Sequence, residues 1–314
     1  MSFLSSIGEN KKNYIVGIIT IIFLVVLFNL LSIEKEENIV KIKKEIIPTD
    51  YSEILNSIEA KSFFVYDINN QKTLFAKNEH EKLPLASITK LITGFIVMDV
   101  LPETTIIDIE KDAIMQEGDS GLVVGEKWKL KDLLDFCLIT SSNDGIYAIV
   151  SAFNKYEEVN SMDAVKMMNE KVKNMGLLDT VFINETGLDV DFQMSGAYSS
   201  ASDISKIFEI IISKNPEMLL KTNLDIASFT SESGILHIAK NTNESINNIP
   251  SVISSKTGFT DLAGGNLAVM FDAGIMRPII VVVLGSTIDG RFSDIEKLVN
   301  IATQKVSEED FVEY

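Results

Sequence analysis

Cysteine and histidine are nearly absent from the chain, which has 314 residues, one cysteine and two histidines. Cys137 has no partner for an intrachain disulfide bond, and its apolar neighbours predict a buried, inert thiol. His80 and His237 lie far apart in the sequence, which argues against a zinc site of the usual kind. Neither histidine belongs to a recognisable Ser-His-Asp motif. We therefore expect no metal and no cofactor.

Positive charge is also scarce. Lysine and arginine total 28 against 45 acidic residues, so the formal net charge is −17 and the pI is about 4.6. Such an acidic chain is not expected to bind nucleic acid by following its phosphates. The length, with 46% hydrophobic residues, allows one large domain or two small ones.

Charge is missing altogether from residues 14–32, YIVGIITIIFLVVLFNLLS. As a helix this run would be about 28 Å long, close to the roughly 30 Å hydrocarbon core of a bilayer. A cleaved signal peptide is the alternative, but the run ends in NLLSIEKEEN without an A-x-A-like site. The sequence favours a cytoplasmic N-terminus over 1–13 and a single transmembrane anchor over 14–33.

Lysines flank this apolar run on both sides, so the positive-inside rule does not decide its orientation. Residues 34–50 are charged and end in Pro-Thr-Asp, which predicts a linker or short stalk. A globular domain is expected over 51–314.

Within that domain, strand-like runs occupy both ends and helical patterns lie between them. Strands are predicted within 61–78, around an Asn-Asn-Gln turn, and over 251–258, 265–273 and 277–287. Helices are predicted over 87–100, over 129–153 with a break at SSND, over 161–176 and 200–214, and from 292 onward. This order predicts an α+β fold, in which an antiparallel sheet made by both halves of the chain packs against a helical cluster.

Three short motifs occur in order: Ser87–Lys90, Ser141–Asn143 and Lys256–Gly258. The first two patterns are common, and copies of them also occur at Ser32–Lys35, Ser213–Asn215 and Ser245–Asn247. Lys-Thr-Gly occurs once. Position separates the motifs from their copies, because Ser87 opens an apolar helix, Ser141 lies in a break between helices and Lys256 closes a strand-like run.

The pair Ser87 and Lys90 suggests a nucleophile and its base. A serine hydroxyl attacks poorly until a base removes its proton, and positions three apart on a helix share a face. Burial and the positive end of the helix dipole would both disfavour a charged Lys90, which would bring its pKa towards neutral. The alternative, a solvated surface lysine, fits Ser32–Lys35 better.

The motifs, in this order, form a set described for penicillin-binding proteins and class A β-lactamases. The blocks around them, including PLASITKLITGF, LLDFCLITSSNDG, INETGLD, YSSASDISKI, the NTN at 241–243 and KTGFTDLAGGNLAVMF, resemble D-alanyl-D-alanine carboxypeptidases. These are low-molecular-mass penicillin-binding proteins, and the resemblance covers about residues 58–305. It implies a β-lactamase/transpeptidase-like fold, a peptidoglycan stem peptide as substrate and β-lactams as covalent inhibitors.

The resemblance also implies a role for each motif residue. Ser87 would form an acyl-enzyme with Lys90 as base, while Ser141 and Lys256 relay a proton to the departing D-alanine. Asn143 would hold the donor peptide. Thr257, Gly258 and Phe259 would line the substrate site, where the backbone N–H groups of Ser87 and Phe259 form an oxyanion hole.

The carboxylate at the end of such a substrate calls for a cation. The chain has two arginines, Arg277 and Arg291. Arg277, at the start of the last predicted strand, is the preferred candidate, because the resemblance places a carboxylate-binding arginine there.

Three alternatives stay open. A β-lactamase needs a base for deacylation, and Glu185 lies between the second and third motifs, although its surroundings in NETGLD favour a structural or solvent-facing role. A non-catalytic wall-binding protein and an endopeptidase are the other two. The resemblance implies a catalytic domain on the outer side of the cytoplasmic membrane, held there by the N-terminal helix.

Overall fold

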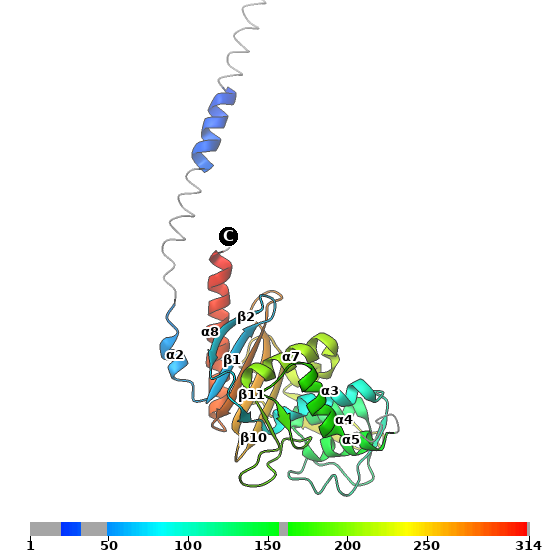
Figure 1. The fold of residues 1–314 in the computed structure, drawn as a ribbon. Helices are drawn as coiled ribbons and strands as arrows, with labels where there is room; N and C mark the ends of the chain where they lie inside the picture. The colour runs from blue at the N-terminus through cyan, green and yellow to red at the C-terminus, as the bar shows by residue number, and fades with distance from the viewer. Residues whose placement is uncertain (1–19, 33–48, 157–162, 313–314) are drawn as a thin grey trace, which may run out of the picture. The chain divides into compact units, whose positions relative to one another are not determined.

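The computed structural model describes residues 20–32, 49–156 and 163–312, and it divides into two compact units, Met1–Asp50 and Tyr51–Tyr314. In the first unit, residues 20–32 are helical (Figure 1). The rest of the predicted anchor (14–19 and 33) and most of the predicted linker lie outside the described residues. Among the residues that are described, no helix is long and apolar enough to cross a membrane.

A five-stranded antiparallel sheet forms the centre of the second unit (Figure 1). Its strand order is β10-β11-β12-β1-β2, so the two ends of the domain sequence meet where β1 pairs with β12. The strands are β1 (Ser62–Asp67), β2 (Lys72–Lys77), β10 (Val252–Thr260), β11 (Gly264–Asp272) and β12 (Pro278–Ser286). Because β11 and β12 are buried on both faces, they are almost continuously apolar.

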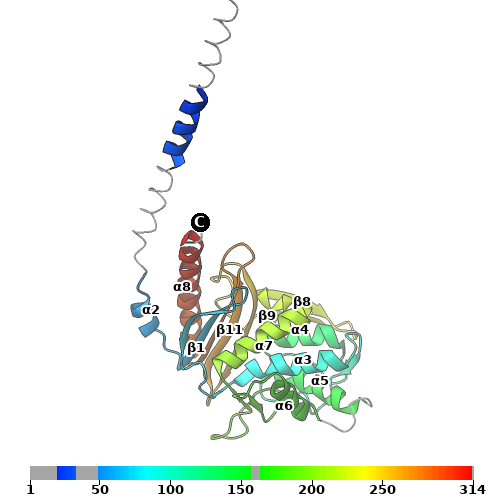
Figure 2. The same cartoon turned by 45° about the horizontal axis from the view of Figure 1, so that its top comes forward.

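Helices cover both faces of this sheet. On one face lies the long helix α8 (Gly290–Val312), with the short α2 (Ser52–Asn56) nearby. On the other face lies α7 (Ala201–Lys214), followed by the rest of the helical cluster (Figure 2). The alternation of side chains along the strands therefore fills two separate cores, one under α8 and one under the helical cluster.

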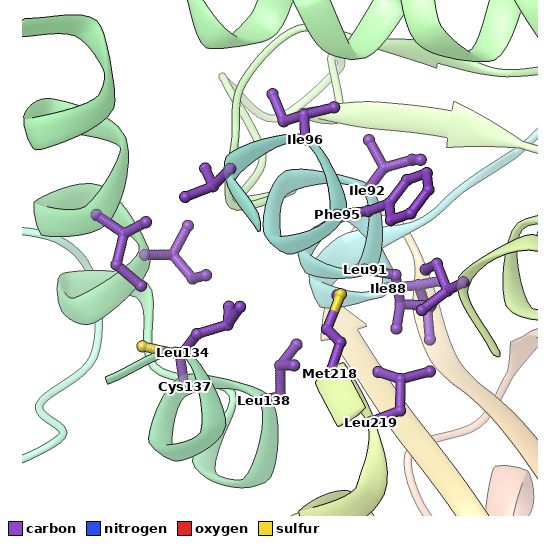
Figure 3. Packing of buried hydrophobic residues seen from close by; sticks show 14 of the residues in the cluster. Ile88, Leu91, Ile92, Phe95, Ile96, Leu134, Cys137, Leu138, Met218 and Leu219 are labelled. Carbon is purple, nitrogen blue, oxygen red and sulfur yellow. The ribbon is translucent and has the colours of Figure 1, made fainter. Parts of the chain in front are cut away.

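The helical cluster is built around α3 (Lys90–Val100), which runs through its middle (Figure 2). Around it lie α4 (Leu130–Thr140), α5 (Asn143–Lys155) and α6 (Ala164–Asn174). Apolar side chains of α3 pack against Leu134, Leu138 and Met218 (Figure 3). Cys137 is fully buried in this core, and burial raises the pKa of its thiol, as expected for an inert cysteine.

Three small sheets complete the described part of the domain. They pair β3 (Leu83–Pro84), β7 (Ala197–Ser199) and β6 (Val181–Phe182), then β4 (Ile106–Asp108) with β5 (Lys127–Lys129), and β8 (Ile226–Thr230) with β9 (Leu236–Lys240). These short strands were not predicted from the sequence. By contrast, the predicted five strands at the two ends of the domain and the helices between them are confirmed, as is the α+β fold.

One predicted boundary is wrong. The segment that was expected to start as an α-helix at Ser87 begins with a 3-10 turn, η1 (Ala86–Thr89), and α3 starts only at Lys90. Ala86 has φ +49, a left-handed conformation that breaks a regular helix at this point.

Candidate active site

The backbone around Ser87 is held in an unusual conformation. Ala86, immediately before it, has a positive φ, and the following residues form the turn η1. The loop at Gly187 packs directly on this turn, since a Cβ at Gly187 would lie 2.0 Å from the Ala86 carbonyl oxygen. Only glycine fits there. The turn that carries Ser87 is therefore packed closely against a distant loop of the chain.

Lys90 lies at the start of α3 and is completely buried. Its Nζ is 2.7 Å from Ser87 Oγ, 2.7 Å from Asn143 Oδ1 and 3.0 Å from the Thr186 carbonyl oxygen. Burial lowers the pKa of Lys90 to about 7, against smaller raising effects from Cys137, Glu185 and Asp144. Near neutral pH a large share of this amine is uncharged and can accept the Ser87 proton.

The second motif lies at the break between α4 and α5. Ser141 ends α4 in the left-handed conformation, with φ +62, and Ser142 caps α5 by accepting a hydrogen bond from the Gly145 N–H at 2.9 Å. Asn143 then starts α5 with its amide between two partners. Its Oδ1 accepts from Lys90, while its Nδ2 donates to the Glu117 carbonyl oxygen at 2.8 Å.

Lys256 projects from β10 to the same place. Its Nζ donates to Ser141 Oγ at 2.9 Å and to the Thr257 carbonyl oxygen at 2.9 Å, and its side chain is buried. Burial lowers its pKa well below the usual lysine value, and the charge of Lys90 lowers it further. Two amines with lowered pKa values therefore face two serine hydroxyls, which is an arrangement suited to moving protons in both directions.

Gly258 allows β10 to come close to the turn that carries Ser87. A Cβ at Gly258 would lie 2.7 Å from the Leu85 carbonyl oxygen and 3.2 Å from the Ser87 backbone nitrogen. Asn266, on the neighbouring strand, donates to the Pro84 and Leu85 carbonyl oxygens and so holds the same segment. Phe259 follows Gly258 at the open edge and is 45% exposed.

Thr257 lies in the same stretch of β10. Its Oγ1 is 2.5 Å from Thr242 Oγ1, in the NTN segment. The Thr257 hydroxyl is therefore hydrogen-bonded to a side chain from a different part of the chain. The structure thus brings eight predicted site residues together: Ser87, Lys90, Ser141, Asn143, Lys256, Thr257, Gly258 and Phe259.

Arg277 lies elsewhere, and its predicted role in binding a substrate carboxylate is wrong. It precedes β12 at the end of the sheet where Asp272 pairs with Pro278, whereas Gly258 pairs with Asn266 towards the other end. Its Nε is 3.0 Å from Asp67 Oδ2 and its Nη2 is 3.4 Å from Glu309 Oε2. A guanidinium already paired with two carboxylates on the far side cannot bind a substrate near Ser87.

Arg291 is the arginine that reaches the site. It follows β12 in the first turn of α8, and its Nη1 donates to the Gly258 carbonyl oxygen at 2.9 Å. Its exposure is only 8%, burial lowers its pKa, and its Nε has no hydrogen-bond partner among the described residues. A cation without a bonded carboxylate in the described part of the chain is therefore available beside the third motif.

The described residues contain no group of three or more His, Cys, Asp or Glu side chains that could hold a metal ion. The side chains that meet at the motifs carry hydroxyls, amines, an amide and one guanidinium. This set matches nucleophilic acyl transfer with a serine as nucleophile and a lysine as base.

Known proteins share this combination of fold and sequence. A family model described as D-alanyl-D-alanine carboxypeptidase, peptidase S11, matches residues 49–287. D-alanyl-D-alanine carboxypeptidase DacF of Bacillus subtilis is 32% identical over 251 residues, covering 78% of this chain and 62% of the relative. D-alanyl-D-alanine endopeptidase of Escherichia coli is 28% identical, over 72% of this chain and 71% of the relative.

Solved structures share the fold of this chain. Penicillin-binding protein D2 of Listeria monocytogenes, in its ampicillin-bound form, is 27% identical with a TM-score of 0.63, covering 78% of this chain and 98% of that one. A mutant of Streptomyces K15 DD-transpeptidase shares the fold, with a TM-score of 0.70 at 24% identity over 78% of this chain and 97% of that one. The chain spans about 60% of the length of several curated relatives. Because the family model covers well over half of its residues, the chain belongs to the D-alanyl-D-alanine carboxypeptidase family.

Proposed function

We propose that the protein is a serine-type D-alanyl-D-alanine carboxypeptidase that removes the terminal D-alanine from peptidoglycan stem peptides. The observation that carries this proposal is the 2.7 Å contact between the Lys90 amine and Ser87 Oγ, together with the pKa of about 7 at Lys90. A serine whose hydroxyl faces a partly neutral, buried amine is an activated nucleophile.

In the proposed reaction, Ser87 Oγ attacks the carbonyl carbon between the two D-alanines while Lys90 takes its proton. The backbone N–H groups of Ser87 and Phe259 hold the developing oxyanion. The close approach of Gly258 to the Ser87 nitrogen supports this pairing of β10 with η1. Lys256 and Ser141 pass a proton to the nitrogen of the departing D-alanine, which leaves an acyl-enzyme on Ser87.

Two further residues position the substrate. Asn143, fixed between Lys90 and the Glu117 carbonyl oxygen, orients the donor peptide. Arg291 supplies the positive charge for the terminal carboxylate, in place of Arg277. Water then hydrolyses the acyl-enzyme. A β-lactam would acylate Ser87 in the same way, and the ampicillin-bound relative from Listeria monocytogenes supports this part of the proposal.

For the location, we propose an uncleaved membrane anchor over 14–33, preceded by a cytoplasmic segment over 1–13 and followed by a linker over 34–50. The domain over 51–314 then lies on the outer side of the cytoplasmic membrane, where its substrate is. The uncharged run at 14–32 supports this arrangement. A cysteine introduced at Glu53, in the exposed part of α2, tests it: a membrane-impermeant thiol reagent should label it in intact cells.

Fluorescent penicillin tests the catalytic proposal directly. The wild-type chain should be labelled covalently and should release D-alanine from an N-acylated peptide ending in D-Ala-D-Ala. Ser87→Ala should abolish both while the melting temperature stays near that of the wild type. An unlabelled wild type would favour a non-catalytic wall-binding protein, and release of larger fragments from cross-linked peptides would favour an endopeptidase.

A β-lactamase remains the second candidate, because Glu185 lies close enough to raise the pKa of Lys90 and precedes Thr186, whose carbonyl oxygen accepts from Lys90. Nitrocefin separates the two activities. Slow, stoichiometric acylation supports the carboxypeptidase. Sustained turnover that is lost in Glu185→Gln would favour the β-lactamase.

A further inference from the structure

A cavity of about 340 Å³, here named the α7 cavity, lies between β1, α7 and the turn after α6 from Met175 to Leu177. In the sheet, β11 and β12 separate β1 from β10, which carries the third motif. Because neighbouring strands are about 4.8 Å apart, β1 lies roughly 14 Å from β10. None of the residues that line the α7 cavity takes part in the proposed reaction.

Two aromatic rings form one wall of the α7 cavity. Phe64 and Tyr66 lie two residues apart on β1, so their side chains share the face of the strand that packs towards the helical cluster. Their ring centroids are 5.8 Å apart, and the two ring planes differ by only 16°. Phe64 is buried and Tyr66 is partly exposed. The two stacked rings therefore give the cavity a flat apolar surface.

The facing wall is one side of α7. Four of its lining residues recur at helical spacing and so share a face of the helix: Ser202, Ser205, Lys206 and Glu209. Lys206 Nζ is 2.7 Å from Glu209 Oε2, so the lysine of this wall is already paired. Asp203 lines the cavity as well and accepts from Thr180 Oγ1 at 2.8 Å. A carboxylate accepts several hydrogen bonds, so both acidic side chains can also accept from hydroxyl or amide groups of a ligand.

The hydroxyl of Ser205 points to a ligand independently of the rings. Ser205 lines the α7 cavity and is only 2% exposed, and its Oγ has no hydrogen-bond partner among the described residues. A buried hydroxyl without a partner costs stability, and the large majority of buried polar groups in proteins have one. A ligand that brings a polar group into the cavity would supply the missing hydrogen bond.

These walls together fit a neutral ring that is apolar on its face and polar at its edge. A pyranose sugar has this character, because C–H groups cover its faces and hydroxyls surround it. The cavity opposes a flat aromatic surface to a row of hydroxyl and carboxylate groups. Sites for small ligands commonly combine an apolar lining with a few polar groups that fix the orientation of the ligand.

We propose that the α7 cavity binds an N-acetylated sugar ring of a peptidoglycan glycan strand. The inference rests on the proposed function only for the source of this sugar, since the stem peptides are attached to such strands. The ring lies against Phe64 and Tyr66, and the methyl group of its acetamido substituent lies against Met175. Ser205 bonds a ring hydroxyl, while Glu209 accepts from the acetamido N–H. A glycan strand held there leaves Ser87 free for a stem peptide.

Isothermal titration calorimetry on the full-length chain tests the proposal, in a detergent without a sugar head group. The probe is tetra-N-acetylchitotetraose, a soluble chain of four N-acetylglucosamines, which should bind saturably. Cellotetraose carries hydroxyls in place of the acetamido groups. It should bind about three- to tenfold more weakly, because it buries no methyl group and lacks the N–H donor. No saturable binding of the acetylated sugar, or equal affinity for the two sugars, would overturn the proposal.

The variant Ser205→Ala separates a ligand-binding role from a structural one. It removes a hydroxyl that has no partner among the described residues, so the melting temperature should be unchanged or slightly higher. Its affinity for the acetylated sugar should nevertheless fall about three- to tenfold, as for one lost hydrogen bond. Tyr66→Leu, which removes the flat ring, should weaken binding by a similar factor of about three to ten.

Ser213→Ala is the matched control, since Ser213 is an exposed serine in the last turn of the same helix and does not line the cavity. It should bind the acetylated sugar like the wild type. Wild-type affinity in Ser205→Ala or in Tyr66→Leu would overturn the proposal.

Fluorescent penicillin separates this site from the proposed activity. Ser205→Ala and Tyr66→Leu should be labelled at the wild-type rate, because both residues lie outside the catalytic centre. Ser87→Ala should not be labelled but should bind the acetylated sugar with wild-type affinity. Loss of sugar binding in Ser87→Ala would place the sugar at the catalytic centre and overturn the inference. A wild type that binds the sugar but is not labelled and releases no D-alanine would overturn the proposed activity alone.

Discussion

The two ends of β12 each carry one of the chain's two arginines, and the residues around them give these arginines opposite properties. Arg277, before the strand, is paired with Asp67 and Glu309. Arg291, about 30 Å further along, is buried, donates to the Gly258 carbonyl oxygen and has no ion pair among the described residues. One end of the sheet pairs its cation with carboxylates of the fold, and at the other end no carboxylate among the described residues bonds to the cation.

The same contrast extends to the lysines. Near Ser87, Lys90 and Lys256 are buried without a carboxylate bonded to them in the described part of the chain, so their pKa values fall. At the far end, Lys72 is half exposed and pairs with Glu309. A buried charge without a partner costs stability, so its presence marks a place where the fold serves binding or catalysis.

The largest loss of activity is expected when Lys90 is substituted. Lys90→Arg replaces an amine that can lose its proton with a guanidinium that cannot. The rate of acylation by fluorescent penicillin should fall at least about 10³-fold, within the range for loss of a general base. Lys171→Arg, at a partly exposed position of α6, should be labelled like the wild type and serves as the control. Normal labelling of Lys90→Arg would show that Ser87 is activated by another group.

Arg291 should have the next largest effect. Arg291→Gln removes the cation beside Gly258, and kcat/KM for a peptide ending in D-Ala-D-Ala should fall about 10- to 100-fold, as for loss of a charged hydrogen bond. A peptide amide without the terminal carboxylate should lose little by the same change. Arg291→Lys should recover part of the activity. Equal losses on the acid and the amide would place the arginine in a structural role.

The change in acylation rate with pH should be smaller than the effects of these substitutions, but it reports directly on the protonation state of Lys90. Because the neutral form of Lys90 is the base and its pKa is about 7, the rate should rise with pH, by about tenfold between pH 6 and pH 8. Stopped-flow measurement with a chromogenic penicillin gives this profile. A rate that is flat over this interval would indicate that Lys90 does not change its protonation state in the reaction.

The sequence predicted the parts of the site that depend on local patterns. Ser87 at the start of an apolar segment, Ser141 at a break between helices and Gly258 near the end of a strand all follow from neighbouring residues. The five long strands and the main helices were predicted for the same reason, because their apolar periodicity extends over many positions. These features needed no knowledge of the tertiary structure.

The remainder depends on contacts between distant segments. The strands β3, β6 and β7 are two or three residues long and exist only because they pair with each other. The left-handed φ of Ala86 occurs in a turn that packs closely against the loop at Gly187, a distant part of the sequence. The choice between the two arginines likewise requires knowing which end of β12 faces Ser87, and strand periodicity carries no such information.

Substitution of Arg277, at the opposite end of β12 from Arg291, should have the smallest effect on activity. Arg277→Gln should leave kcat/KM within about twofold of the wild type, since the residue lies far from Ser87. It should instead lower the free energy of unfolding by about 1–3 kcal/mol, because the fully buried Asp67 loses its charged partner. Thermal unfolding should show a melting temperature that is lower by several degrees.

The control for this prediction is Arg277→Gln combined with Asp67→Asn, which removes the unpaired charge together with its partner. Asp67 also accepts hydrogen bonds from the Asn70 backbone and side chain, and an asparagine oxygen can keep one of them. The double variant should therefore be no less stable than Arg277→Gln alone. A large fall in kcat/KM at unchanged stability in Arg277→Gln would mean that the far end of the sheet also acts on the substrate.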